Sequence, residues 1–110
     1  MTREELKTLM DGTGIYYDPD HPDHIERSKI ENLPPPFIEF LAEEVPFSAD
    51  DVIYFTSLRI TIRFYSDLDV DEAEESIRTA LNDYFFTTNK VYDDELGLWE
   101  TEFIFTTKKE

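Results

Sequence analysis

The chain has 110 residues and a mass of 13.0 kDa, the size of a single domain spanning residues 1–110. Nine Phe, six Tyr and one Trp within 40% hydrophobic residues predict a folded core rather than a disordered acidic tail. Twenty-six acidic residues against ten basic ones give a formal net charge of −16, which argues against a basic surface for DNA, RNA or anionic lipid. Cysteine is absent, which excludes disulfides and zinc–thiolate sites, and no apolar run reaches the roughly 18 residues of a membrane span.

The first third of the chain predicts one helix and a long irregular segment. Thr2–Asp11 has helical apolar spacing, with Thr2 as the N-cap and Gly12 as the residue that stops the helix. Ile15–Tyr17 is compatible with a short strand. Residues 18–35 contain four prolines and are predicted to be irregular, and loops of this length are often functional or mobile.

The middle of the chain contains the strongest strand pattern. Phe37–Glu43 alternates apolar and other residues, which predicts a half-buried strand, and Ser48–Asp51 predicts a turn. Val52–Tyr65 alternates over its whole length and predicts a long strand with one apolar and one polar face, with room for a β-bulge. Its apolar face carries Val52, Tyr54, Thr56, Leu58, Ile60, Ile62 and Phe64.

The last third predicts a helix and a closing hairpin. Asp71–Tyr84 is amphipathic, and its buried stripe is expected to begin at Val70 and to include Ile77. Lys90–Asp94 and Leu98–Thr107 are predicted strands joined by a turn. The order of elements predicts an α+β fold in which two helices pack on one face of a mainly antiparallel sheet of four to five strands.

No segment carries a recognisable catalytic or metal-binding pattern. The two histidines, His21 and His24, lie in an Asp-rich loop, but a proline-broken loop does not promise the rigid support that a metal site needs. Asp67–Asp71 opens like a calcium loop, yet Glu72 and Arg78 occupy the positions where such a loop needs Gly and Glu. We therefore expect no enzymatic activity, no metal and no cofactor.

Arg59 and Arg63 lie on the polar face of the long strand, and two interpretations of them remain open. The first is cross-strand pairing with an acidic residue of a neighbouring strand. The candidates for that pairing are Glu39, Glu100 and Glu102. The second interpretation is a contact surface for an acidic partner subunit.

Five short pieces follow one another in a distinctive order. A proline-led strand, Pro35–Phe40, precedes an Ala49–Asp50 turn and a long strand that ends in Phe64–Asp67. An acidic helix from Asp71 and a closing strand from Trp99 come next. In this order the pieces resemble the tail terminator, or tail-completion, proteins of long-tailed bacteriophages and their prophages. The resemblance covers about two thirds of the chain.

The resemblance implies a structural role in the virion tail. Such proteins assemble as a ring, usually a hexamer, on the head-proximal end of the tail tube. The implied partners are other copies of the chain, the tube protein and a head-completion protein. DNA passes through the lumen without specific binding, no membrane takes part, and assembly takes place in the host cytoplasm.

Within that role, several residues are candidates for the contacts between subunits or with partners. Besides Arg59 and Arg63 these are Phe37, Ile53, Phe55, Tyr65, Asp50 and Asp51. The loop Asp18–Asn32 matches nothing in the family and is, together with the turn Glu44–Asp51, a second candidate for partner contact.

Two other functions stay open. An acidic protein of this size can mimic DNA and block a nuclease or a repressor, which requires carboxylates spaced like phosphates along an exposed face. The chain can also be a neighbouring component of the head–tail connector, a stopper or an adaptor, since those proteins share its size and acidity.

Overall fold

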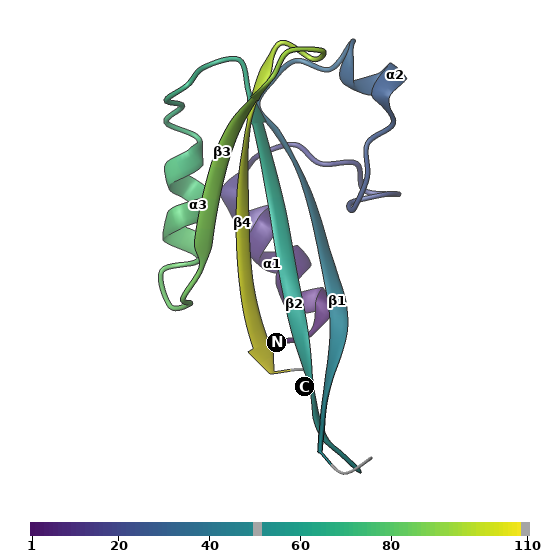
Figure 1. Ribbon diagram of the computed structural model, residues 1–110. Coiled ribbons are helices and arrows are strands. Elements are labelled where there is room, and N and C mark those ends of the chain that lie inside the picture. The colour runs from purple at the N-terminus through teal and green to yellow at the C-terminus, as the bar shows by residue number, and fades with distance from the viewer. Residues whose placement is uncertain (50–51, 109–110) are drawn as a thin grey trace.

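The computed structural model describes the backbone of residues 1–49 and 52–108, and the side chains of all of these except 46–49 and 52–55. The described residues form an open four-stranded antiparallel sheet with three helices (Figure 1), which confirms the α+β class. In chain order the elements are α1 (Arg3–Thr13), α2 (Arg27–Ile30), β1 (Phe37–Ala49), β2 (Val52–Ser66), α3 (Glu74–Ala80), β3 (Thr87–Asp93) and β4 (Leu98–Lys108). The strands lie in the order β1-β2-β4-β3, so β1 and β3 are the two edges of the sheet.

The outer edge of β1 is held by the segment that precedes it. The N–H groups of Ile38 and Phe40 donate to the carbonyl oxygens of Tyr16 and Pro22, at 2.9 and 2.7 Å. Alternate residues of an antiparallel strand bond to alternate sides, so the even-numbered residues of β1 direct their N–H groups away from β2. The short strand predicted at Ile15–Tyr17 is only a single bridge to the first residue of β1.

β1 is longer than its alternation predicts. A turn was expected over Ser48–Asp51, whereas β1 passes through Pro46 and continues to Ala49. Pro46 is an even-numbered residue of β1, a position at which the backbone nitrogen faces the outer edge. Because proline has no amide hydrogen, its place here costs no hydrogen bond to β2. The register with β2 shifts directly after Phe47, in agreement with a β-bulge in the long hairpin.

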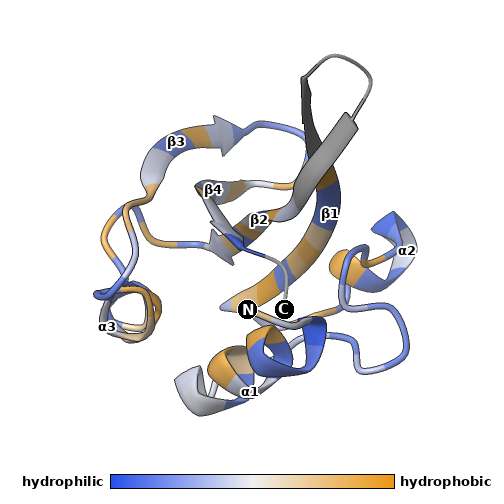
Figure 2. Ribbon diagram, turned by 90° about the horizontal axis from the view of Figure 1, so that it is seen from below, coloured by the Kyte–Doolittle hydropathy of each residue, from blue (hydrophilic) through white to orange (hydrophobic). Residues whose placement is uncertain are grey.

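One cluster of buried apolar side chains joins the sheet to α1 and α3. It includes Leu6 and Met10 of α1, Ile77 of α3 and the even-numbered β2 residues from Leu58 to Phe64. Figure 2 shows both helices on the same side of the sheet. We call this side the first face and the opposite side the second face. The alternation of β2 thus sets which of its residues meet the helices.

α1 begins where the sequence predicts and ends later. The Thr2 hydroxyl accepts the N–H of Glu5 at 3.1 Å, which confirms Thr2 as the N-cap. The prediction that Gly12 stops the helix is wrong, because Gly12 lies inside it. The helix ends at Gly14, whose φ of 72° is left-handed and whose N–H donates to the carbonyl of Asp11.

α3 is shorter than the predicted helix. The carboxylate of Asp71 accepts the N–H of Ala73 at 2.9 Å and the hydroxyl of Ser66 at 2.6 Å, so a turn precedes the first helical residue. Val70 lies before this turn and is 83% exposed, which makes its predicted place in the buried stripe wrong. Ile77 is fully buried, as predicted.

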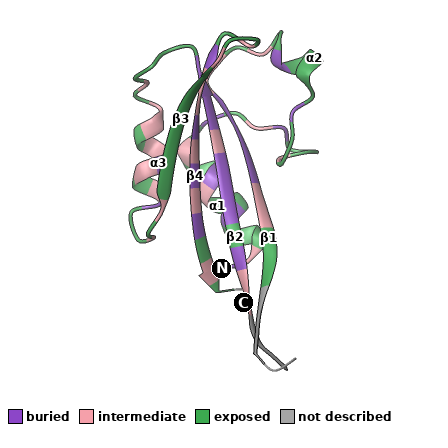
Figure 3. Ribbon diagram, viewed as in Figure 1, coloured by how far each residue is buried: buried purple, intermediate pink, exposed green. Residues whose placement is uncertain are grey.

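Residues 18–36, of which 18–35 were predicted to be irregular, wrap around β1 onto one end of the second face. They contain the single helical turn α2. Figure 3 shows buried positions in this segment next to the buried start of β1. The segment and the sheet share a second, smaller buried cluster of Ile25, Ile30, Phe37, Tyr65 and Leu98.

Candidate functional site

The loop that carries both histidines is held by its own hydrogen bonds. The carboxylate of Asp18 accepts the N–H of Asp20 at 3.0 Å and lies 3.3 Å from Nζ of Lys29. These contacts, the backbone hydrogen bond first, lower the pKa of Asp18, and the bond to Asp18 raises the pKa of Lys29. His21 and His24 line a small hollow beside this pair. Among the described residues, no three His, Asp or Glu side chains are grouped to hold a metal ion.

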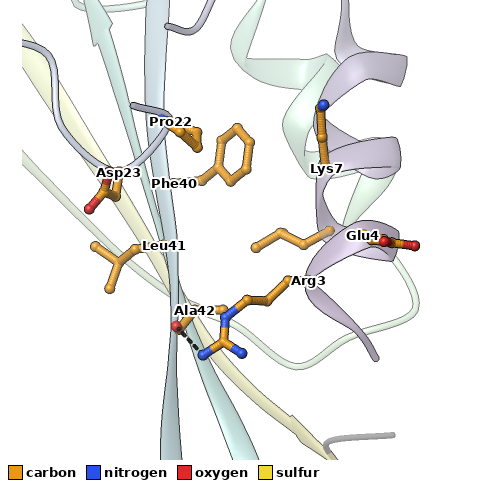
Figure 4. A pocket seen from close by; sticks show the side chains of 9 residues that line it. Arg3, Glu4, Lys7, Pro22, Asp23, Phe40, Leu41 and Ala42 are labelled. Atoms are coloured by element: carbon orange, nitrogen blue, oxygen red, sulfur yellow. Dashed lines mark hydrogen bonds between the residues drawn. The ribbon is translucent and has the colours of Figure 1, made fainter. Parts of the chain in front are cut away.

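A groove of about 410 Å³ lies between α1 and β1 (Figure 4). Its apolar part includes Phe40 and Pro22, and Lys7 stands on the α1 side. The guanidinium of Arg3 donates to the carbonyl oxygen of Ala42 at 3.3 Å, at the outer edge of β1. The charged residues of the lining are Arg3, Glu4, Lys7 and Asp23.

The two arginines of the second face contact glutamates across the sheet. Nε of Arg63 lies 3.6 Å from Glu100 and 3.5 Å from Glu102, both on β4. Arg59 lies 3.8 Å from Glu43 of β1, and both of these side chains are about half exposed. Burial raises the pKa of Glu100, and Arg63 opposes that shift. The geometry supports the cross-strand interpretation, with Glu43 as a partner that the sequence did not suggest.

Phe37 and Tyr65, two of the candidate interface residues, are buried inside the chain. Their rings stack with centroids 5.1 Å apart. The hydroxyl of Tyr65 donates to the buried carboxylate of Glu39 at 2.8 Å, and the N–H of Ile25 donates to the same carboxylate at 2.7 Å. Burial and this hydrogen bond raise the pKa of Tyr65. Both aromatic rings therefore belong to the core beneath residues 25–33.

The other candidate residues fall where the structure gives no side chains. Asp50 and Asp51 lie outside the described residues. Ile53 and Phe55 belong to β2 by their backbone, and their side chains lie outside the described part. Of the candidates whose side chains are described, Arg59 and Arg63 contact glutamates within the sheet, and Phe37 and Tyr65 are buried.

The sequence did not single out the open edge formed by β3. All of its residues are exposed except Asp93, which is half-buried (Figure 3). In β1 the amide groups point alternately to the outer edge and to β2. The registers of β2 with β4 and of β4 with β3 are unbroken, so the same alternation can be followed from strand to strand to give the direction of each amide in β3. Thr88, Lys90 and Tyr92 direct their N–H and C=O groups to the free edge. We call these backbone groups the β3 edge.

The surface around the β3 edge is also apolar. Phe85, directly before the strand, is fully exposed, and Val91 and Tyr92 are about half exposed. Val91 and Tyr92 are consecutive residues of the strand and lie on opposite faces of the sheet, so exposed apolar surface is present on both sides of the β3 edge. The sequence signal was weak because the strand Thr87–Asp93 has no apolar alternation.

No protein-family model, curated protein or solved structure matches the chain. None of the helices in the described part of the chain is long and apolar enough to span a membrane. The described residues define an α+β domain with an open strand edge at β3.

Proposed function

We propose that this chain is a subunit of a phage tail terminator ring, which caps the tail tube and joins it to the head connector. The observation that carries the proposal is the order of the elements. β1 follows the prolines, the long β2 ends at Ser66, α3 comes next, and the β3–β4 hairpin closes the sheet. This is the order of four of the five pieces on which the resemblance rests. The remaining piece, the Ala49–Asp50 turn, falls partly outside the described residues, and Ala49 belongs to β1.

The arrangement of the sheet is compatible with a ring subunit. In this proposal α1 and α3 occupy the first face, and residues 18–36 cover one end of the second face. The β3 edge and the rest of the second face are then left for neighbours. The work of the protein is contact rather than catalysis, so the proposal includes no enzymatic activity, cofactor or metal.

The charge suits a passage for DNA. Six copies at −16 carry a formal charge of −96, and an acidic lumen repels the phosphate backbone and lets it slide. The same charge opposes assembly, so the contacts between copies have to be locally neutral or apolar. The proposed partners are other copies, the tube protein and a head-completion protein, in the virion tail after assembly in the host cytoplasm.

The test is electron microscopy of particles from the encoding phage after deletion of this gene. We expect tubes of irregular and excessive length that are not joined to heads, and rescue when the chain is supplied in trans. Abundant tails of normal length, joined to heads, would contradict the proposal.

The same experiment separates the two other functions. A connector component predicts finished tails of normal length beside heads that leak or fail to join. A DNA mimic predicts normal particles and competition with DNA for a nuclease or repressor. Internal pairing of carboxylates with basic side chains argues against an array that mimics phosphates: the paired residues include Asp18, Glu43, Glu74, Glu95, Glu100 and Glu102.

A further inference from the structure

In the described part of the chain, the outer edge of β1 is covered by other groups, whereas the outer edge of β3 is open. Along β1, the carbonyls of Tyr16 and Pro22 occupy two edge amides, Arg3 occupies the carbonyl of Ala42, and Pro46 has no amide hydrogen to offer. Carbonyl partners, a cation and a proline are all devices that block the addition of another strand. In the described residues, β3 has no such cover along its edge.

Lys90 is the residue of β3 whose charge could block the pairing of another strand, and its ammonium group contacts other residues of the chain. A lysine on an edge strand usually discourages another strand from adding. The ammonium of Lys90 donates to the carbonyl of Asp69 and lies 3.6 Å from the carboxylate of Glu74. Its charge is therefore engaged with the α3 side of the molecule, and the backbone of Lys90 stays accessible.

The β3 edge is also locally neutral. Lys90 and Asp93 are the only charged residues of the strand, so its formal charge is zero in a chain of −16. Exposed apolar surface at Phe85, Val91 and Tyr92 adds to it. Two copies of so acidic a chain repel one another, and they can approach most easily where neither presents net charge.

A second copy offers a matching strand. Ser57 of β2 lies opposite Lys108, the last described residue of β4. In the described part of the chain, Val52, Ile53, Phe55 and Thr56 have partners in β1 alone, and Tyr54 is skipped at the register shift. These five residues, Val-Ile-Tyr-Phe-Thr, carry no charge and are rich in β-formers.

We propose that the β3 edge is the docking site for a second copy of this chain, whose β2 residues 52–56 add as a new strand. The contact joins two different surfaces, so it repeats from copy to copy and can close into a ring. Pairing of β3 with β3 of another copy would join like surfaces and stop at two. The inference rests on the proposed ring and names the contact that builds it.

The test compares Thr88→Pro with Thr88→Ala by light scattering over a concentration range of about 5 to 500 µM. The N–H of residue 88 faces the free edge, so proline removes a donor for the added strand and no bond to β4. Thr88→Ala keeps the N–H and is the matched control. We expect Thr88→Pro to weaken self-association by about ten-fold or more, and Thr88→Ala to assemble like the wild type.

Amide hydrogen exchange of the wild type gives an independent readout that needs no variant. The amides of Thr88, Lys90 and Tyr92 should exchange freely at low concentration and become protected as assembly proceeds. Those of Asn89 and Val91 bond to β4 and should be protected at both concentrations. This alternating pattern distinguishes an added strand from general burial of the surface.

Each outcome decides the point. A wild type that stays monomeric, or a Thr88→Pro chain that folds and assembles normally, overturns the inference. A limiting species of twice 13.0 kDa, about 26 kDa, would show that like surfaces pair, as in β3–β3 pairing, and would overturn it as well. A ring that survives Thr88→Pro leaves the proposed function standing, whereas normal tails after gene deletion overturn that function whatever the contact.

Discussion

Glu39 ties the segment 18–36 to the sheet through one buried carboxylate. Its oxygens accept the N–H of Ile25 and the hydroxyl of Tyr65, and Glu39 itself is only 4% exposed. Replacing Glu39 by alanine leaves both donors buried without a partner, which costs roughly 1–3 kcal/mol for each group.

We therefore expect Glu39→Ala to lower the free energy of unfolding by about 2–6 kcal/mol in urea titrations. Glu43→Ala is the matched control, since Glu43 lies on the same side of β1 and makes only an exposed ion pair with Arg59. Its expected cost is about 0.5 kcal/mol or less. Equal costs for the two variants would contradict the buried role of Glu39.

Asp18 makes the stability of the chain depend on pH. Its pKa is lowered in the folded chain, chiefly by the N–H of Asp20 and also by Lys29. Its ionised form therefore stabilises the fold above the unfolded pKa of about 3.9, and that contribution is lost as pH falls through the lower folded pKa.

Urea midpoints measured from pH 7 down to about pH 3 test this dependence against Asp18→Asn. Asparagine keeps an oxygen for the turn but carries no charge. The wild type should exceed the variant in stability at neutral pH, and the difference should shrink as the medium becomes acidic. A difference that is constant with pH would show that the charge of Asp18 contributes nothing.

At the scale of elements, the end of α1 depends on which of two glycines is left-handed. Gly12 lies inside the helix, and a methyl group added to its Cα would meet no atom within 4 Å, whereas Gly14 has a φ of 72°. Alanine should stabilise the helix interior by up to about 1 kcal/mol and destabilise the left-handed end by about 1 kcal/mol.

Thermal unfolding of Gly12→Ala and Gly14→Ala measures this directly. We expect the melting temperature to rise for Gly12→Ala and to fall for Gly14→Ala. The reverse order would place the helix stop at Gly12, as the sequence alone suggested.

The elements that sequence could predict are those whose burial differs between faces. The even-numbered residues of β2 from Leu58 to Phe64 meet α1 and α3, and the range of the strand and this part of its apolar face were predicted. Val52 and Tyr54, assigned to the same face, have side chains outside the described part. β3 is exposed on both faces, so it leaves no periodic signal, and its start at Thr87 was missed. Residues 18–36 looked irregular because their order comes from distant partners, such as Glu39, rather than from local pattern.

The candidate site was harder to predict than the fold, for the same reason. Sequence parity placed Phe37 and Tyr65 away from the helices, but it could not show that residues 25–33 fold back over them. Cross-strand pairing was one of two interpretations that the sequence left open, and Arg63 contacts two of the three candidate partners, Glu100 and Glu102. The third candidate, Glu39, instead accepts hydrogen bonds from Ile25 and Tyr65. The open β3 edge depends on what the rest of the chain leaves uncovered, which no local pattern contains.

At the scale of the whole molecule, the charge of −16 sets how assembly should respond to salt. A contact through a neutral edge is opposed only by general repulsion between acidic copies. At 0.1 M salt the Debye length is about 10 Å, so repulsion between exposed charges farther apart than this is largely screened. Raising the salt from about 0.05 to 0.5 M should therefore strengthen self-association, as followed by sedimentation. Association that weakens with salt would instead favour ion pairs between copies, through Arg59 among others.

The central claim is that copies of this chain join head to tail into a closed ring. The native mass by light scattering, over rising concentration and at moderate salt, tests it most directly. We expect one species at six times 13.0 kDa, about 78 kDa, that forms as concentration rises. A chain that stays at 13.0 kDa over the whole range would contradict the claim.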